Sequence, residues 1–425
     1  MAGRSVAIVG AGWAGIAAAS ECVRRGHRVT LFEMGARAGG RARDVHTSAG
    51  TLDNGQHICI GAYVETLRLL ERLGISERDA FVRLPLTLVD PSGRGLRLRR
   101  GAAAPAFVRA VLGRRGWPVG DRLALLAAAA GWWRHQFRCD ADWTVARLAA
   151  ALPRSVREGL IDPLCVAALN TPAAQASASV FLRVLRDALA SGPGSADLLL
   201  PRVGLGSLLP EPALEALRRE GAVVRLGTRV VDVGADGDRW RVDSSRFDRV
   251  ILAASTRESA RLASPHDSGW ARSAAALRQE PIVTVYAQAR GARLAEPMLL
   301  LHSNGRSPAQ FVFDRGQLGG PAGLLAFVVS GASAWVERGT DALEQAVLGQ
   351  AGESLGGSLP EPLRVVQTIV EKRATFACTP DSVRPPMRIV PGLLAAGDYV
   401  SGPYPATLEG AVRSGIAAAV ALTDP

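Results

Sequence analysis

The stretch SVAIVGAGWAGIAAASECVRRGHRVTLFE, residues 5–33, decides the fold of this chain. It begins with a short apolar run, continues with the pattern G-x-G-x-x-G at residues 10–15 and an alanine-rich segment, and ends with a second apolar run closed by Glu33. A strand–helix–strand unit that opens with these glycines and closes with an acid is typical of dinucleotide-binding folds. The stretch therefore predicts an α/β domain that binds a dinucleotide.

Each residue of this motif has a physical role. Gly10 permits the tight turn after the strand, Gly12 lets the backbone approach a pyrophosphate, and Gly15 lets the helix pack on the strand. The helix N-terminus offers free N–H groups and a partial positive charge to phosphate. Glu33 follows Gly12 by 21 residues, where a carboxylate accepts hydrogen bonds from an adenosine ribose.

Three further segments favour FAD over NAD as the dinucleotide. Residues 39–43 (GGRAR) combine two glycines with Arg41, which can pair with phosphate. Residues 53–57 (DNGQH) form a polar glycine turn. Near the C-terminus, Gly397-Asp398 follows an apolar run, and a helix is expected from Thr407. The dipole of that helix can stabilise negative charge on a reduced flavin. A nicotinamide cofactor needs no such second anchor.

Together these residues resemble the flavin amine oxidase and carotenoid desaturase superfamily, over nearly the whole chain and most closely at 6–61 and 392–418. Residues 53–57 followed by Gly61-Ala62-Tyr63, with 371–376 (EKRATF) and Pro380, are similar to its hopanoid-associated branch. That branch was named squalene-associated FAD-dependent desaturase and is now regarded as hydroxysqualene dehydroxylase. The resemblance implies FAD as cofactor and a C30 isoprenoid as substrate.

The resemblance also implies positions for the cofactor. It places a backbone contact to adenine at Val230, within a strand that the sequence predicts over 229–233. It also places residues 54–57 beside the isoalloxazine and Leu408 against its pyrimidine side. Many members have arginine where this chain has Gly35, so we expect Arg37 or Arg41 to substitute for it. The predicted FAD-binding residues are Gly10, Gly12, Gly15, Glu33, Gly40, Arg41, Asn54, Gly55, Gln56, His57, Val230, Gly397, Asp398 and Leu408.

The implied reaction removes the allylic hydroxyl of hydroxysqualene as water and delivers a hydride from reduced FAD. The protein must protonate the leaving group, exclude water and hold the carbon in place. His57 is the first candidate for the proton donor, because histidine titrates near neutral pH; the alternative is a structural hydrogen bond closing its turn. Lys372, the only lysine, is the second candidate, with a surface lysine or an ion pair to Glu371 as the alternative.

Other functions remain open from the sequence. A carotenoid- or phytoene-type desaturase would share the fold but oxidise its substrate. An amine oxidase is less favoured, because its usual aromatic cage needs two rings beside the flavin and the chain has four tyrosines. A non-catalytic FAD-binding isoprenoid carrier is the alternative of another class. The sequence does not identify the electron donor that reduces FAD.

The fold class predicted is α/β with α+β character: a Rossmann-type FAD-binding domain, assembled from discontinuous segments, with an interleaved substrate domain of mixed sheet and helices. The expected parts of the FAD-binding domain are 1–85, 201–260 and 386–425. Residues 86–200 are expected to form a helical region that faces the substrate or a membrane, and 261–385 the sheet and helices of the substrate domain. The helical segments at 105–190 and the strands near 281–329 are the expected lining of an apolar substrate tunnel.

Composition limits the location and partners of the protein. Five scattered cysteines without a C-x-x-C, and histidines without ligand spacing, predict a reducing cytoplasm and no metal site. The net charge is +11, but no recognition motif points to nucleic acid. Attraction to an anionic membrane fits better, so we expect a peripheral protein at the inner face of the cell membrane. Residues 123–133 are apolar between two arginines and predict either a buried helix or a monotopic membrane element.

Overall fold

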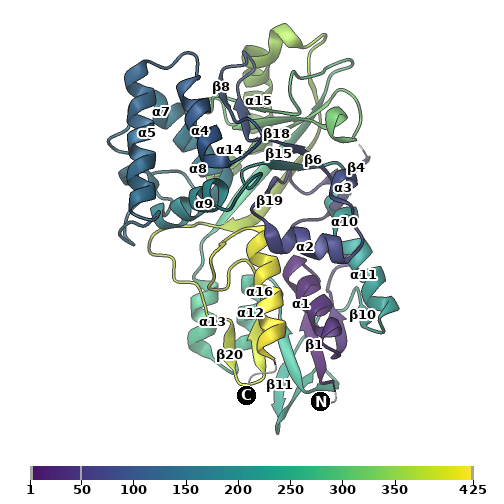
Figure 1. The fold of residues 1–425 in the computed structure, drawn as a ribbon. Helices are drawn as coiled ribbons and strands as arrows, with labels where there is room; N and C mark the ends of the chain where they lie inside the picture. The colour runs from purple at the N-terminus through teal and green to yellow at the C-terminus, as the bar shows by residue number, and fades with distance from the viewer. Residues whose placement is uncertain (1–2, 48–49, 423–425) are drawn as a thin grey trace.

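The computed structural model describes residues 3–47 and 50–422, and its largest sheet is the one that residues 5–33 predict (Figure 1). The strand order is β10 (Val223–Arg225), β2 (Arg28–Phe32), β1 (Ser5–Val9), β14 (Arg249–Leu252), β21 (Leu393–Ala395) and β20 (Arg388–Val390). The first five strands are parallel, and β20 is antiparallel to β21. Three distant stretches of chain therefore build one sheet, which confirms the discontinuous Rossmann-type architecture.

The large sheet is covered on both faces. Val6 and Ile8 of β1 lie in the core beneath helices, whereas Ala7 and Val9 lie in the core on the opposite side. Burial on both faces explains why this strand is an unbroken apolar run rather than an alternating one. The helices of the first layer are α1 (Trp13–Arg24), α11 (Pro210–Arg219) and α16 (Leu408–Ala421).

Helices α1 and α16, from opposite ends of the sequence, pack against each other (Figure 1). A Cβ atom added to Gly415 of α16 would lie 2.1 Å from the carbonyl oxygen of Ala14 in α1. Only glycine permits so close an approach of two backbones. The N- and C-terminal parts of the chain are therefore joined directly in the cofactor region.

A second sheet lies at the other end of the molecule. Its order is β16 (Met298–Leu300), β17 (Phe311–Asp314), β18 (Leu324–Val329), β15 (Gln279–Gln288) and β19 (Arg364–Phe376), all antiparallel. Val283 and Val285 of β15 pack with Leu343 and Val347 of α15 (Thr340–Leu355). Strand side chains alternate between faces, so Thr284, between these valines, lies on the other face of the second sheet.

A helical lobe joins the second sheet (Figure 1). It contains α4 (Ala103–Leu112), α5 (Val119–Arg134), α6 (Val145–Leu148), α7 (Arg154–Val156), the π-helical turn η1 (Arg157–Ile161), α8 (Asp162–Leu169) and α9 (Ala178–Ala190). The expectation of a mostly helical segment at 105–190 is confirmed. No helix within residues 3–47 and 50–422 is long and apolar enough to cross a membrane.

Smaller elements complete the fold. The small sheets and hairpins are β3 (Asp44–Thr47) with β4 (Gly50–Asp53), β5 (Cys59–Ile60) with β9 (Leu198–Pro201) and β6 (Phe81–Leu84), β7 (Thr87–Val89) with β8 (Gly95–Arg97), and β11 (Val233–Asp236) with β12 (Arg239–Val242) and β13 (Ser245–Phe247). The remaining helices are α2 (Val64–Arg72), α3 (Glu77–Ala80), α10 (Leu205–Leu208), α12 (Thr256–Ala263), α13 (Ser268–Ala275), α14 (Ser333–Arg338) and the 3₁₀ turns η2 (Arg315–Leu318) and η3 (Gly356–Ser358).

One expected strand is wrong. The sequence predicts a strand over Arg229–Val233, but the chain there is extended without strand pairing until β11 begins at Val233. The amides of Val231 and Asp232 both donate at 3.0 Å to Oδ1 of Asp243 instead. A side-chain carboxylate has taken the place of a neighbouring strand.

Candidate cofactor and substrate site

A cavity of about 660 Å³ runs from the glycine turn after β1 to the second sheet. Its walls come from the carboxyl ends of β1 and β2, the start of α16, and one side of β15, β17 and β19. Ligands of open α/β sheets bind at the carboxyl ends of parallel strands. The cavity contains thirteen of the fourteen predicted FAD-binding residues; only Gly15 is outside its lining.

The glycine turn has the constraints that the motif predicts. Gly10 has a φ of +107°, and a Cβ there would lie 2.6 Å from the carbonyl oxygen of Ala253. A Cβ on Gly15 would lie 1.8 Å from the carbonyl oxygen of Gly10. Gly12, in contrast, faces only Gly40, whose Cα would be 3.9 Å from an added Cβ. Close backbone contacts thus require glycine at Gly10 and Gly15, whereas the space beside Gly12 is open.

Glu33 lies at the end of β2 and is fixed by backbone amides. Its Oε2 accepts a hydrogen bond from Ala11 N at 2.8 Å, and its Oε1 accepts one from Gly35 N at 2.7 Å. A carboxylate has about four acceptor sites, so both oxygens retain capacity for ribose hydroxyls. Gly35 supplies a backbone donor to Glu33, and Arg37 and Arg41, the expected substitutes for an arginine at position 35, both lie in the cavity lining.

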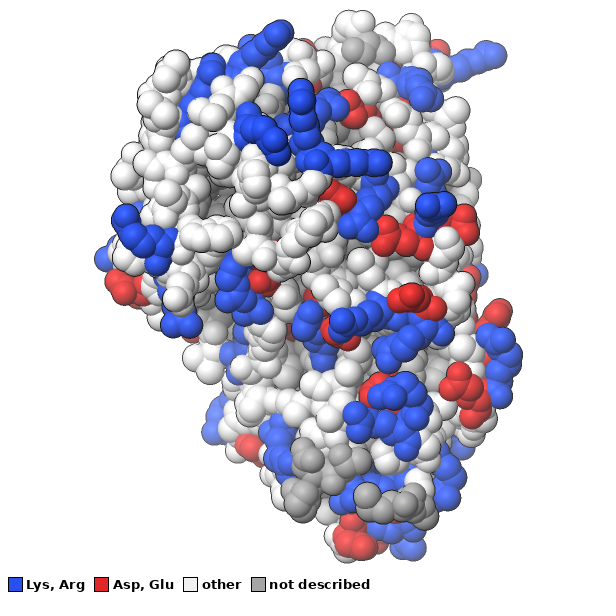
Figure 2. Space-filling model, in the orientation of Figure 1, with Lys and Arg blue, Asp and Glu red and all other residues white. Residues whose placement is uncertain are grey.

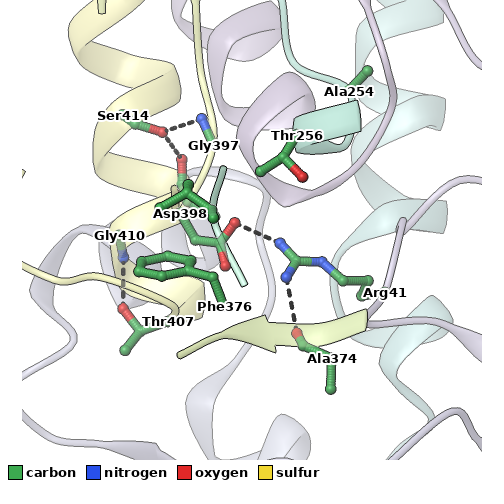
Figure 3. A network of polar contacts seen from close by, with 12 residues as sticks. Arg41, Ala254, Thr256, Ala374, Phe376, Gly397, Asp398, Thr407, Gly410 and Ser414 are labelled. Atoms are coloured by element: carbon green, nitrogen blue, oxygen red, sulfur yellow. Dashed lines mark hydrogen bonds and ion pairs between the residues drawn. The ribbon is translucent and has the colours of Figure 1, made fainter. Parts of the chain in front are cut away.

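Arg41 and Asp398 form an ion pair within the cavity wall (Figure 3). The other guanidinium nitrogen of Arg41 donates to Ala374 O of β19 at 2.8 Å. Asp398 follows β21, and the preceding Gly397 N donates to Ser414 Oγ of α16 at 2.8 Å. The sequence assigns Arg41 and Asp398 separately to the cofactor, whereas the structure shows that they also hold each other.

The last helix begins as expected at the cavity. Thr407 is its N-cap, with Oγ1 accepting from Gly410 N at 2.9 Å (Figure 3). Leu408, the first residue of α16, is part of the lining. Val230 also lines the cavity, and its carbonyl accepts from Arg261 at 2.9 Å, so its N–H is the backbone group left to meet a ligand.

The turn at residues 53–57 brings polar atoms into the cavity. Asn54 Nδ2 donates to Glu371 Oε2 at 2.8 Å and to Arg41 O at 3.0 Å. Gln56 Oε1 accepts from Arg315 at 3.0 Å, while its Nε2 is buried and has no partner within the described chain. Because arginine only donates, this orientation of the amide is fixed. A buried N–H donor without a partner fits an acceptor on a bound flavin ring.

His57 is half-buried in the same turn. Its Nδ1 lies 2.8 Å from Gly55 O, so Nδ1 carries the proton and donates to that carbonyl. Burial lowers the pKa of His57, the Gly55 carbonyl opposes this, and Arg41 lowers the pKa further. The ring is therefore neutral near pH 7, with Nε2 as an acceptor. This geometry does not suit a proton donor.

Lys372 does not reach the cavity. Glu371 and Arg373 line the cavity, whereas the exposed Lys372 between them does not. The carboxylate of Glu371 accepts from Asn54 and, at 3.2 Å, from the backbone amide of Arg373. Sequence reasoning chose the lysine and missed the adjacent glutamate, because strand register decides which of them faces inward.

Asp53 does not line the cavity but holds the turn at residues 53–57 through hydrogen bonds to the surrounding structure. Its Oδ1 accepts from Leu205 N at 2.8 Å, and Tyr286 OH donates to its carbonyl at 3.0 Å. Burial raises the pKa of Asp53 to about 6, against the lowering effect of Arg315. Arg315 thus contacts both Asp53, at 3.7 Å, and Gln56. No sequence signal connects this arginine with residues 53–57.

The far end of the cavity is apolar. Ala167, Ala168 and Leu169 of α8 lie on one side, and Ile282 of β15, Phe311 and Phe313 of β17 and Val328 of β18 lie on the other. These residues come from the helical segment and the strands that the sequence predicts as tunnel lining. Within the described residues, no group of three or more His, Cys, Asp or Glu side chains could hold a metal ion.

Comparison with known proteins identifies the relatives of this chain. Residues 13–423 match the family model described as flavin containing amine oxidoreductase. Hydroxysqualene dehydroxylases of Rhodopseudomonas palustris and Sinorhizobium fredii are each 28% identical, over 98% of this chain and 97% of theirs. The crystal structure of an oxidoreductase from Methanosarcina mazei aligns with a TM-score of 0.72 at 14% identity, covering 97% of this chain and 99% of that one.

Proposed function

The chain belongs to the flavin-containing amine oxidoreductase family, and we propose that this FAD-dependent oxidoreductase reduces hydroxysqualene to squalene. The observation that carries the proposal is the similarity to two hydroxysqualene dehydroxylases along almost the entire chain. The cavity supports it, because an apolar end opposite the cofactor residues suits a hydrocarbon. Burying a long chain there contributes about 0.8 kcal/mol per CH₂ without polar contacts.

The cofactor residues fit FAD from both ends. The open space beside Gly12 and Gly40, at the N-terminus of α1, supports binding of a pyrophosphate there, and the remaining acceptor capacity of Glu33 supports binding of a ribose. Gln56 presents its unpartnered N–H, and α16 begins at the cavity with its capped N-terminus. When bound in its reduced form, FAD supplies a hydride. The C–O bond of the substrate breaks, the hydroxyl leaves with one proton as water, and the carbon gains the hydride.

The chain must then supply that proton. We assign this role to Glu371 in preference to His57, whose lowered pKa keeps it neutral. Both oxygens of Glu371 accept from N–H donors of Asn54 and Arg373, which orient the carboxyl in the cavity wall. His57 and Gly55 instead shape the turn.

Product analysis tests the proposal. The FAD-loaded protein is reduced without oxygen and mixed with detergent-dispersed hydroxysqualene, and squalene is measured by mass spectrometry. We expect squalene together with reoxidation of the flavin. Activity on phytoene with an electron acceptor, and none on hydroxysqualene, would support the desaturase alternative. No spectral change with any isoprenoid would support a non-catalytic carrier.

The same proposal places the protein at the cytoplasmic face of the cell membrane as a peripheral protein. A C30 hydrocarbon substrate partitions into the bilayer, and the net charge of +11 favours an anionic surface.

A further inference from the structure

Helix α5 presents an apolar stripe to solvent. Val119, Leu123, Ala127, Ala130 and Trp133 are all exposed and follow one another by three or four residues, which places them on one face. The exposed fractions of Val119, Leu123 and Trp133 are 65%, 55% and 51%. A surface helix ordinarily carries charged or polar residues on this face. Leu125, with the partly buried Leu126, Ala128 and Trp132, packs against the core, and this packing does not account for the exposed stripe.

Helix α4 extends this surface. Val108 and Leu112 are also exposed, and α4 packs against α5. Of the eleven large apolar side chains exposed in the described residues, five therefore lie between 108 and 133. We call the surface formed by these five side chains and by Ala127 and Ala130 the α4–α5 face. A cluster of exposed large apolar side chains is typical of a binding surface.

Positive charge surrounds the α4–α5 face. Arg109, Arg115, Arg134 and Arg138 are exposed near it. The single acidic residue of segment 103–138, Asp121, is half-buried and accepts a hydrogen bond from Ser155. Figure 2 shows wide uncharged areas over the helical lobe, with basic side chains around them. Apolar side chains bordered by arginine fit the surface of an anionic bilayer.

The charge also decides between a bilayer and a second copy of the chain. In a two-fold dimer the same surface meets itself, which would bring arginines against arginines. Trp133 beside Arg134 at the end of α5 instead matches the pairing of aromatic and basic residues at a membrane–water interface.

The α4–α5 face is connected to the substrate end of the cavity. Gly159 of η1 lies beside Trp117, just before α5: a Cβ added to Gly159 would be 3.7 Å from the Trp117 ring. Helix α8 follows η1 directly, and its last three residues line the cavity. Eight residues of α helix span about 12 Å. One short helix thus separates the exposed surface from the apolar lining.

We propose that the α4–α5 face docks on the surface of an anionic phospholipid bilayer, with α5 lying in the interface, so that a membrane-dissolved substrate enters beside α8. The identity of that substrate rests on the proposed function, but the docking itself does not.

Vesicle flotation of the FAD-loaded protein tests the docking without any substrate. We expect binding to vesicles of phosphatidylglycerol and phosphatidylcholine, and at least tenfold weaker binding to phosphatidylcholine alone. Leu123→Glu and Trp133→Glu should each weaken binding to the anionic vesicles at least tenfold. Val383→Glu is the matched control, because Val383 is 75% exposed but lies outside the α4–α5 face, and it should bind like the unmodified protein.

The outcomes separate docking from catalysis. Leu123→Glu should keep its flavin absorbance and its rate on detergent-dispersed substrate, but lose rate on substrate embedded in anionic vesicles. Unchanged vesicle binding by both glutamate variants would overturn the proposal. The proposal would also be overturned if the unmodified protein formed a dimer and did not bind vesicles, and if Leu123→Glu dissociated that dimer. Failure to form squalene in detergent would reject the reaction and leave the flotation result standing.

Discussion

The two ends of the cavity are built by different means. The cofactor end is formed by backbone: glycines at 10, 12 and 40, amides that hold Glu33, and the N-termini of two helices. The substrate end is formed by apolar side chains from α8, β15, β17 and β18. Backbone geometry demands particular residues at particular positions, whereas an apolar wall accepts many residues of similar volume. The sequence of the cofactor end therefore predicts which ligand binds there, whereas the sequence of the substrate end predicts only the chemical class of the ligand.

The strongest test of this contrast lies within the glycine motif. Gly15→Val should abolish soluble folded protein, because its Cβ would overlap the carbonyl of Gly10 at 1.8 Å. Gly12→Val should fold, since only Gly40 lies near the new Cβ, yet it should weaken FAD binding by about 100-fold, or about 3 kcal/mol. Thermal unfolding and flavin absorbance distinguish the two. A folded Gly12→Val protein that is fully loaded with FAD would contradict the assignment.

Glu371→Gln tests the proposed proton donor, which lies where the cofactor end and the substrate end of the cavity meet. Loss of a general acid costs about 10²–10⁴-fold in rate, so we expect turnover to fall at least 100-fold while FAD stays bound. His57→Ala should slow turnover by less than about tenfold, because its pKa is already lowered. Single-turnover reoxidation of the reduced flavin measures both rates. The reverse order of effects would return the proton-donor role to His57.

Phe313→Ala and Phe327→Ala compare the two faces of the second sheet. Both rings are buried, and each loss should lower the free energy of unfolding by about 3–5 kcal/mol. Only Phe313 lines the cavity, whereas Phe327 packs in the core with α15. We therefore expect KM to rise about tenfold for Phe313→Ala alone. Equal KM values for the two variants would remove β17 from the substrate site.

The pH dependence of stability tests Glu21 in α1, the helix at the cofactor end of the cavity. Hydrogen bonds from Arg24 lower the pKa of Glu21 in α1 to about 2, from an ordinary value of 4.5, with burial opposing and Arg25 assisting. As the pH falls, Glu21 is protonated in the unfolded chain before it is protonated in the folded protein. Up to about 3 kcal/mol of the free energy of unfolding is therefore present above pH 4.5 and lost toward pH 2. Urea unfolding at several pH values should show a flatter dependence for Glu21→Gln. The same pH dependence of the free energy of unfolding in both proteins would contradict this role of Glu21.

Sequence reasoning succeeded where the determinants are local. Gly15 packs against the carbonyl of Gly10, Thr407 caps its own helix through Gly410 N, and Glu33 accepts from Ala11 N, 22 residues away. Sequence reasoning did not predict contacts between residues that lie far apart along the chain. Asn54 meets Glu371 across 317 residues, and Gln56 meets Arg315 across 259. The strand expected at 229–233 failed for a different reason, because the side chain of the nearby Asp243, rather than a neighbouring strand, accepts from the amides of Val231 and Asp232.

The contact between α1 and α16 has a consequence for how the protein is made. Because Gly415 lies against Ala14, and β14 and β21 complete the sheet that β1 begins, the first helix has no finished surface to pack on during most of translation. We therefore expect the N-terminal segment to complete its packing only after residues beyond 415 have left the ribosome. Coenzyme loading should then occur late in biogenesis, and truncations that remove α16 should yield apoprotein that chaperones retain.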